Sequence, residues 1–203
     1  MLVAFAAANA QEHPDLGSGP DLGSGGVWLP KHVADAAPPK EAPSKGPAIG
    51  GNDPSTRCLP PGVPRIMLQS RPFEIVQTPN RILILFEGGA HVFRQIWMDG
   101  REHPKDPNPD WLGDSVGHWD GNTLVVDSVG FNDKTWLDDA GHRHTERLHV
   151  TEKFTRVSPR SMRYEALLDD PGAYAQSWTV RNTFSFEPGG TLAEDICLDK
   201  IAR

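Results

Sequence analysis

The chain has 203 residues, 37% of them hydrophobic, which is enough to build the core of one folded domain. Its formal net charge of -7 and its scattered Lys and Arg residues argue against nucleic acid as a partner, because nucleic-acid-binding proteins normally present a basic surface. No apolar run reaches the roughly 18 to 20 residues that a membrane-spanning helix needs, so we expect no membrane partner.

Residues 1–10 resemble the apolar segment and the cleavage site of a secretory signal peptide. The stretch from Met1 to Ala7 is mostly apolar, and Ala8-Asn9-Ala10 matches the A-x-A pattern of cleavage sites. The basic residue that normally precedes the apolar segment is absent. We therefore expect a signal-peptide remnant over residues 1–10 and a periplasmic or secreted bacterial protein, with an ordinary Ala-rich tail as the alternative.

Residues 11–64 predict a largely irregular arm. The sequence Pro-Asp-Leu-Gly-Ser-Gly occurs at residues 14–19 and again at 20–25, and residues 38–64 are rich in Pro, Gly and small polar side chains. Such a composition buries too little apolar surface to order itself. Trp28 with its apolar neighbours, and Cys58, are the expected points of attachment to the folded domain.

The chain has two cysteines, Cys58 just before the predicted domain and Cys197 near its end. In an oxidising compartment a single pair of cysteines favours a disulfide, which here would tie the arm to the last predicted strand. Two buried free thiols are the alternative, because sequence spacing does not establish the geometry of a disulfide.

From residue 73 the sequence changes to short β-rich runs separated by turn sequences such as Asp120-Gly121-Asn122. The runs predict strands near residues 73–77, 82–87, 91–98, 123–129, 147–157, 162–168, 178–187 and 192–198. Short links and almost no helix favour an antiparallel meander that closes on itself, since closure removes exposed strand edges. We predict an all-β domain over residues 65–203, a lipocalin-like (calycin-like) barrel, with a two-sheet sandwich as the alternative. The long links 101–119 and 130–146 are expected at the barrel mouth.

Alternation within the predicted strands places polar side chains on apolar faces. Glu152, for example, shares a face with Val150 and Phe154. Four further residues have the same placement: Arg94, Glu87, Asn182 and Glu194. Such groups predict a lined cavity, in which Glu152 and Glu194 are candidate catalytic acids or bases and Arg94 holds an anionic group. The alternative is a buried ion-pair network that fixes the strand register.

Aromatic residues gather in the long links and the neighbouring strands: Trp97, Trp111, Trp119, Trp136, Tyr174 and Trp178. An indole ring stacks on a flat or sugar-like ligand while its N–H group bonds the ligand's polar edge. We expect the ligand-binding residues to be Asn182, Glu87, Trp178, Trp136, Trp119 and Tyr174. The alternative is that the rings only pack the core and plug the loops.

Three histidines lie close together in sequence, His142, His144 and His149, and His118 lies in the other long link. Imidazole suits zinc and copper, but a cupin-like barrel needs a Glu three or four residues after the second His, and no Glu is there. We therefore expect no bound metal; these four histidines are the ligands if one binds. Motifs for a nucleophilic Ser, a phosphate loop or a dinucleotide are absent too, so we expect no cofactor.

Two segments carry a resemblance: residues 117–127, GHWDGNTLVVD, and residues 130–138, GFNDKTWLD. Both resemble segments of a group of uncharacterised exported bacterial proteins, and residues 58–62, 104–107 and 169–178 match that group as well. The resemblance covers residues 58–197. It implies export and a shared fold, and it implies no activity.

Three functions follow from these observations. The first is an exported barrel that binds a small organic molecule in a partly polar cavity. The second is a cofactor-independent lyase, isomerase or hydrolase that uses Glu152 or Glu194. In that case the substitution Glu152→Gln is expected to lower activity more than stability. The third is a structural or interaction module whose loops and arm form the working surface.

Overall fold

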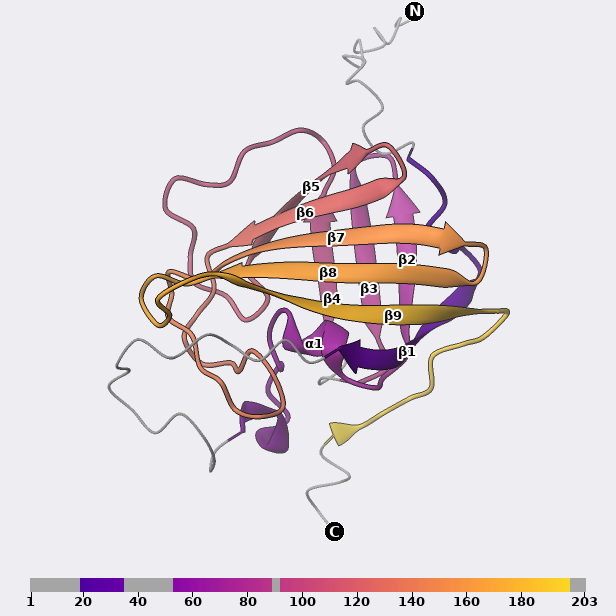
Figure 1. Ribbon diagram of the computed structural model, residues 1–203. Coiled ribbons are helices and arrows are strands. Elements are labelled where there is room, and N and C mark those ends of the chain that lie inside the picture. The colour runs from indigo at the N-terminus through magenta and orange to yellow at the C-terminus, as the bar shows by residue number, and fades with distance from the viewer. Residues whose placement is uncertain (1–18, 35–52, 89–91, 198–203) are drawn as a thin grey trace, which may run out of the picture.

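The computed structural model describes residues 19–34, 53–88 and 92–197. Within these ranges nine strands follow one another around a closed barrel, with β5 to β9 on the near side of Figure 1 and β2 to β4 behind them. The strands are β1 (Gly26–Ala34), β2 (Phe73–Thr78), β3 (Arg81–Phe86), β4 (Phe93–Trp97), β5 (Asp114–Asp120), β6 (Thr123–Val129), β7 (His149–Ser158), β8 (Ser161–Asp169) and β9 (Trp178–Pro188). Two short helical turns, η1 (Pro54–Arg57) and α1 (Arg65–Leu68), lie between β1 and β2. The predicted signal-peptide remnant lies outside the described residues.

The strands pair with their neighbours in chain order, and β9 returns to pair with β1. All of these pairs are antiparallel except β4 and β5, which run parallel and share the single registered pair Trp97 and Val116. The prediction of an all-β barrel, consistent with a lipocalin-like barrel, is confirmed, and the two-sheet sandwich is wrong. The parallel pair departs from the predicted antiparallel meander. It also leaves few backbone pairs at the seam between β4 and β5.

Two strands are not predicted from the sequence. Strand β1 lies in the stretch expected to be an irregular arm, and β5 lies in the expected long link 101–119. Strand β1 contains Pro30, which lacks a backbone donor, and its register with β9 shifts just after that residue. Strand β5 carries polar residues with little strand preference. Long-range pairing, with β9 for β1 and with β6 for β5, forms both strands despite these local sequences.

The predicted last strand, residues 192–198, is wrong over the part that the structure describes. Residues 191–196 have no regular secondary structure, and Leu198 lies outside the described residues. The positions of Leu192, Glu194 and Ile196 match the alternating pattern of a strand. Among the described strands, however, none is free to pair with this segment, because β9 already pairs with β1 and β8.

Alternate side chains along each strand point inward and form one continuous apolar cluster. Aromatic rings contact one another at its centre, with the ring centroids of Phe73 and Phe184 4.9 Å apart and those of Phe154 and Tyr164 5.0 Å apart. Each fully buried side chain of this kind contributes roughly 1.5–3 kcal/mol. Among the described residues, the interior is thus a packed core rather than the expected lined cavity.

A disulfide between Cys58 and Cys197 is present, with Cα atoms 5.6 Å apart, and confirms the predicted pairing. It joins the segment before α1 to the segment after β9. A bond of this kind fits an oxidising compartment outside the cytoplasm. None of the helices in the described ranges is long and apolar enough to cross a membrane.

The substitution of both Cys58 and Cys197 by Ser should lower the free energy of unfolding by up to about 5 kcal/mol, because the bond closes a loop between residues 139 positions apart. Intact-mass analysis of the protein with and without reductant would confirm the bond first. Urea denaturation of oxidised and reduced protein then measures its contribution. Two free thiols in protein from an oxidising compartment would contradict the prediction.

The buried guanidinium of Arg65 holds the segment before α1 in place. Its Nη1 and Nη2 atoms donate to the two oxygens of Asp53 at 2.7 and 2.6 Å, and its Nε donates to Asp139 at 2.8 Å. The hydrogen bonds from Arg65 lower the pKa of Asp53 to about 2, against the opposing effect of partial burial. Asp53 also caps η1 through the backbone N–H of Ser55.

Because the pKa of Asp53 is below its unfolded value of 3.8, its contribution to stability is complete above about pH 4 and is lost as the pH falls toward 2. We expect Asp53→Asn to lower the unfolding free energy by about 1–2 kcal/mol at pH 6, allowing for solvent screening of the exposed part of Asp53. Asn keeps the helix cap, so the ion pair is isolated. Urea denaturation of both proteins from pH 6 to pH 2.5 should show the difference shrinking; a constant difference would contradict this origin.

Candidate functional site

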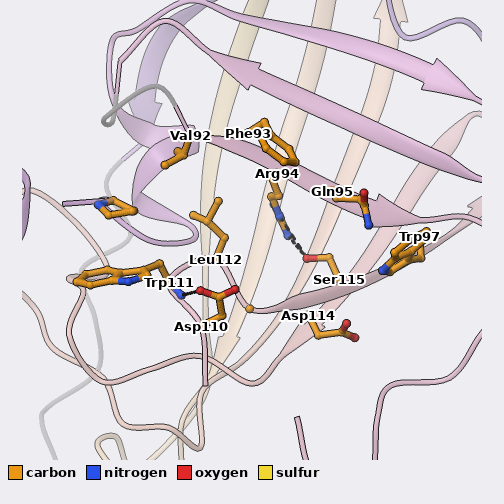
Figure 2. A pocket seen from close by; sticks show the side chains of 12 residues that line it. Val92, Phe93, Arg94, Gln95, Trp97, Asp110, Trp111, Leu112, Asp114 and Ser115 are labelled. Atoms are coloured by element: carbon orange, nitrogen blue, oxygen red, sulfur yellow. Dashed lines mark hydrogen bonds between the residues drawn. The ribbon is translucent and has the colours of Figure 1, made fainter. Parts of the chain in front are cut away.

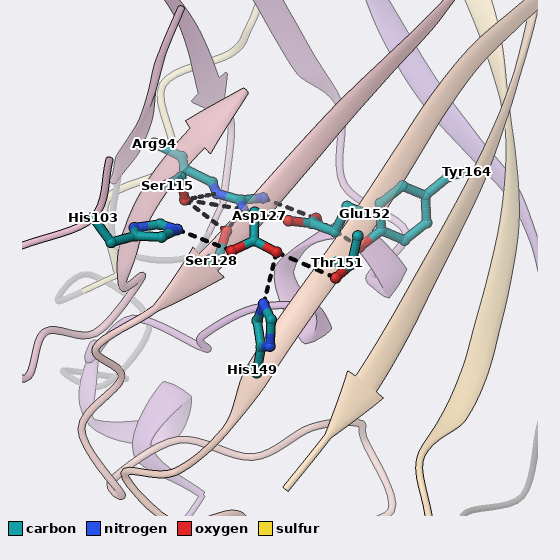
Figure 3. Close-up of polar contacts among 9 residues, drawn as sticks. All are labelled: Arg94, His103, Ser115, Asp127, Ser128, His149, Thr151, Glu152 and Tyr164. Carbon is teal, nitrogen blue, oxygen red and sulfur yellow. Dashed lines mark hydrogen bonds and ion pairs between the residues drawn. The ribbon is translucent and has the colours of Figure 1, made fainter. Parts of the chain in front are cut away.

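A buried ion pair joins β4 to β7 across the barrel interior. The Nη1 atom of Arg94 donates to Glu152 Oε1 at 2.8 Å, and its Nη2 atom donates to Oε2 of the same carboxylate (Figure 3). Arg94 is 1% exposed and Glu152 is fully buried. The predicted inward placement of both side chains is confirmed.

Hydroxyl groups from three other strands complete this inner network. Arg94 donates from Nε and Nη2 to Ser115 Oγ on β5, at 3.3 and 3.1 Å, and from Nη2 to Ser128 Oγ on β6 at 2.9 Å. The hydroxyl of Tyr164 on β8 donates to Glu152 Oε1 at 2.8 Å. Side-chain bonds therefore link β4 to β5 at the seam where the backbone pairing is weakest.

The inner network keeps its charges inside the core. Burial lowers the pKa of Arg94, but the charge of Glu152 and its hydrogen bonds to the guanidinium together raise it, and the net shift is upward, so the guanidinium stays charged. Burial and the same carboxylate raise the pKa of Tyr164 well above its usual value, so its hydroxyl stays a donor. This arrangement matches the predicted alternative of a buried ion-pair network. A catalytic role for Glu152 and Arg94 stays a prediction.

The other predicted interior polar residues have different placements. Asn182 is buried as expected, and its Nδ2 donates to the carbonyl of Met67 at 3.1 Å, which ties β9 to α1. Glu87 lies on the outer side of the barrel, where it accepts a hydrogen bond from the backbone N–H of Ala193 at 3.0 Å. Glu194 is exposed in the irregular segment after β9, so the interior position predicted for it is wrong.

The predicted aromatic ligand-binding residues do not converge on one site. The buried ring of Trp136 lies under the guanidinium of Arg65, 5.1 Å from ring centroid to Cζ. The rings of Tyr174 and Trp178 contact each other edge-on at 4.5 Å, and the Tyr174 hydroxyl donates to a loop carbonyl. Trp119 is partly buried and packs closely against Gly19. Apart from the contact between Tyr174 and Trp178, these rings lie in different parts of the structure.

A pocket of about 450 Å³ lies beside the seam between β4 and β5, where the two strands share a single registered pair (Figure 2). We call it the seam pocket. Its lining residues are Pro60, Val92, Phe93, Arg94, Gln95, Trp97, Asp110, Trp111, Leu112, Gly113, Asp114 and Ser115. Arg94 and Ser115 belong to the inner network as well, and each is 1% exposed, so this buried network lies directly behind the wall of the pocket.

Aromatic and apolar side chains form much of the seam pocket. Trp97 and Trp111 come from the aromatic set predicted in the sequence, whereas Phe93 and Leu112 were not predicted. The guanidinium of Arg101 stacks on Trp97 at 3.6 Å, and Phe93 is 60% exposed. Strand alternation could have predicted the outward position of Phe93, because an inward Arg94 requires its neighbours in β4 to point outward.

A histidine and aspartate cluster lies on the outer face of β5, β6 and β7 (Figure 3). Asp127 on β6 is its centre: His103 Nε2 contacts Asp127 Oδ1 at 3.0 Å, and His149 Nε2 contacts Oδ2 at 2.6 Å. The hydroxyl of Thr151 donates to Oδ2 at 3.4 Å. The other ring nitrogen of His103, Nδ1, lies 2.6 Å from Asp114 Oδ1. We call these five residues the outer cluster.

The outer cluster fixes the protonation of its central carboxylate. Partial burial raises the pKa of Asp127, but the contacts with His149 and His103 lower it by more, so the net shift is downward. His103 faces a carboxylate with each ring nitrogen, and only the doubly protonated ring can donate to both. His103 thereby fastens the link between β4 and β5 to the barrel.

The four histidines named as ligands for a metal are not brought together. His144 is buried, with Nε2 2.7 Å from the Thr135 hydroxyl, and burial lowers its pKa. His142 contacts Asp138 at 2.6 Å, His118 is exposed, and His149 belongs to the outer cluster. In the part of the chain that the structure describes, no group of three or more His, Cys, Asp or Glu residues is arranged to hold a metal ion.

Comparison of the chain with protein-family models, with curated proteins and with solved structures found no match. The resemblance to exported bacterial proteins therefore stays a prediction.

The substitution Glu152→Gln should lower the free energy of unfolding by about 3–5 kcal/mol, because it leaves Arg94 charged and unpaired in the core. The matched control is Glu165→Gln, which breaks the exposed ion pair with Arg181 between β8 and β9. That pair is expected to contribute at most about 1 kcal/mol. Urea denaturation measures both, and equal small losses would show that the inner network is dispensable for stability.

Proposed function

We propose that the protein is exported and binds a small organic molecule in the seam pocket. The observation that carries the proposal is the pocket of about 450 Å³ beside the seam between β4 and β5, where the two strands share a single registered pair. A volume of this size suits a small ligand, and an apolar pocket with a few convergent polar groups is typical of ligand sites. The disulfide supports export.

The lining indicates the chemistry of the ligand. Phe93, Trp97 and Trp111 offer flat faces to an apolar or aromatic body. The carboxylates at the rim, Asp110 and Asp114, accept hydrogen bonds and repel anions. The charge of Arg94 is already neutralised by Glu152. An uncharged, flat molecule with at least one hydrogen-bond donor fits these features best.

An acid/base enzyme that uses Glu152 has less support. The carboxylate is fully buried, and both of its oxygens accept hydrogen bonds from Arg94, with Tyr164 on one of them as well. A substrate would have to displace these donors before a proton could be transferred. A purely structural module has less support too, since it gives no reason for a large exposed aromatic side chain such as Phe93 at the rim of a pocket.

The binding proposal is tested with N-phenyl-1-naphthylamine, an uncharged, flat fluorescent molecule with one N–H donor. We expect the wild-type protein to bind it and Phe93→Ala to weaken binding about tenfold, or about 1.4 kcal/mol, because a wall of the pocket is removed. Trp111→Ala should act in the same direction. Fluorescence titration measures the affinities.

The control for this experiment is Val157→Ala, which truncates an exposed apolar side chain on β7 outside the seam pocket. Its affinity should equal that of the wild type. Absence of binding by the wild type, or equal affinities for all four proteins, would overturn the proposal.

A further inference from the structure

Five histidines have described side chains, and they differ in what their two ring nitrogens contact. Both nitrogens of His103 and of His144 have hydrogen-bond partners. His118 is exposed and is held by no carboxylate among the described contacts. His142 and His149 each have one nitrogen on a carboxylate, at 2.6 Å in both cases, and one nitrogen with no partner among the described residues.

Only one of these last two histidines lines a described pocket. His149 lies at a second pocket of about 570 Å³, formed by residues 104–107 and 109 of the link after β4, residues 129–131, residues 146–149 and Pro171. We call it the loop pocket. His149 is 44% exposed, so its ring is accessible. His142 lines neither the seam pocket nor the loop pocket.

The contact with Asp127 determines which nitrogen of His149 is free to react. A carboxylate only accepts, so in the neutral ring Nε2 carries the proton and donates it to Asp127 Oδ2. The Nδ1 atom then holds the lone pair. Asp127 stays ionised because the two histidines lower its pKa, and it stabilises the imidazolium that forms when Nδ1 takes up a proton.

We propose that His149 is a general base in the loop pocket, positioned by Asp127, and that it activates water for the hydrolysis of a small carboxylic ester. The Nδ1 atom removes a proton from water as the water oxygen adds to the ester carbonyl. The tetrahedral intermediate then expels the alcohol, which takes up the proton from the imidazolium, so that ester and water yield acid and alcohol.

The lining of the loop pocket fits this class of substrate. Pro104, Pro107 and Pro109 provide apolar surface for an acyl group, and the buried side chains of Phe131 and Leu148 lie at the base of the pocket. The same pocket is lined by two cations, Lys105 and Arg147, and by two carboxylates, Asp106 and Glu146. In the proposed reaction, the cations oppose the negative charge that develops on the carbonyl oxygen. The site lies in a different pocket from the proposed ligand site and does not depend on binding there.

The test uses 4-nitrophenyl butyrate, and release of nitrophenolate is followed by absorbance. We expect the wild-type protein to hydrolyse the ester faster than buffer alone and His149→Asn to lower kcat/KM about a hundredfold, toward the buffer rate. Asp127→Asn should lower kcat/KM less and move the rate profile to lower pH, because a positioning carboxylate favours the protonated imidazole. Exogenous imidazole should restore part of the rate to His149→Ala.

The matched control is His142→Asn, which removes a histidine with the same kind of carboxylate contact outside the loop pocket. It should keep the wild-type rate, because His142 does not line the loop pocket. Thermal melting shows that each variant is folded. A wild-type rate equal to that of buffer, or equal loss in His149→Asn and His142→Asn, would overturn the proposal.

Discussion

The ion pair between Arg94 and Glu152 is the interaction on which the barrel depends. Two opposite charges without solvent contact persist only where each has partners, and here the partners come from five consecutive strands, β4 to β8. Backbone pairing is poorest between β4 and β5, and the bonds from Arg94 to Ser115 cross that seam. The side-chain network thus reinforces the barrel where its backbone pairing is sparsest.

The inner network and the outer cluster lie back to back across the same sheet. Neighbouring residues supply the two sides: Asp114 is outside and Ser115 inside on β5, Asp127 and Ser128 follow the same order on β6, and Thr151 and Glu152 on β7. Successive side chains of a strand point to opposite faces, so a polar pair on each of three strands builds a polar site on both faces.

The link between β4 and β5 brings the two pockets into one structural unit. Its first half, residues 104–109, borders the loop pocket, and its second half, residues 110–113, borders the seam pocket. His103 fastens the link to the barrel through Asp114 and Asp127. A loop on a rigid scaffold is a common place for binding and catalysis, because it shapes a site without weakening the core.

The sequence by itself determined much of this protein. The β-rich runs and their turn sequences predicted most of the strands and the barrel class, and the presence of two cysteines predicted the disulfide. Strand alternation predicted the inward side of Arg94, Glu152 and Asn182. Alternation defines two faces but not which face is inside, so Glu87 was assigned to the wrong one. An alternating pattern also occurs in segments that have no strand to pair with, and for this reason the segment around Glu194 was predicted to be a strand. Only the tertiary structure decided three features: the pairing of Arg94 with Glu152, the sparse pairing of β4 with β5, and the contacts of His103 and His149 with Asp127. The side-chain contacts in these features join residues 22 to 58 positions apart, and local sequence patterns do not encode such contacts.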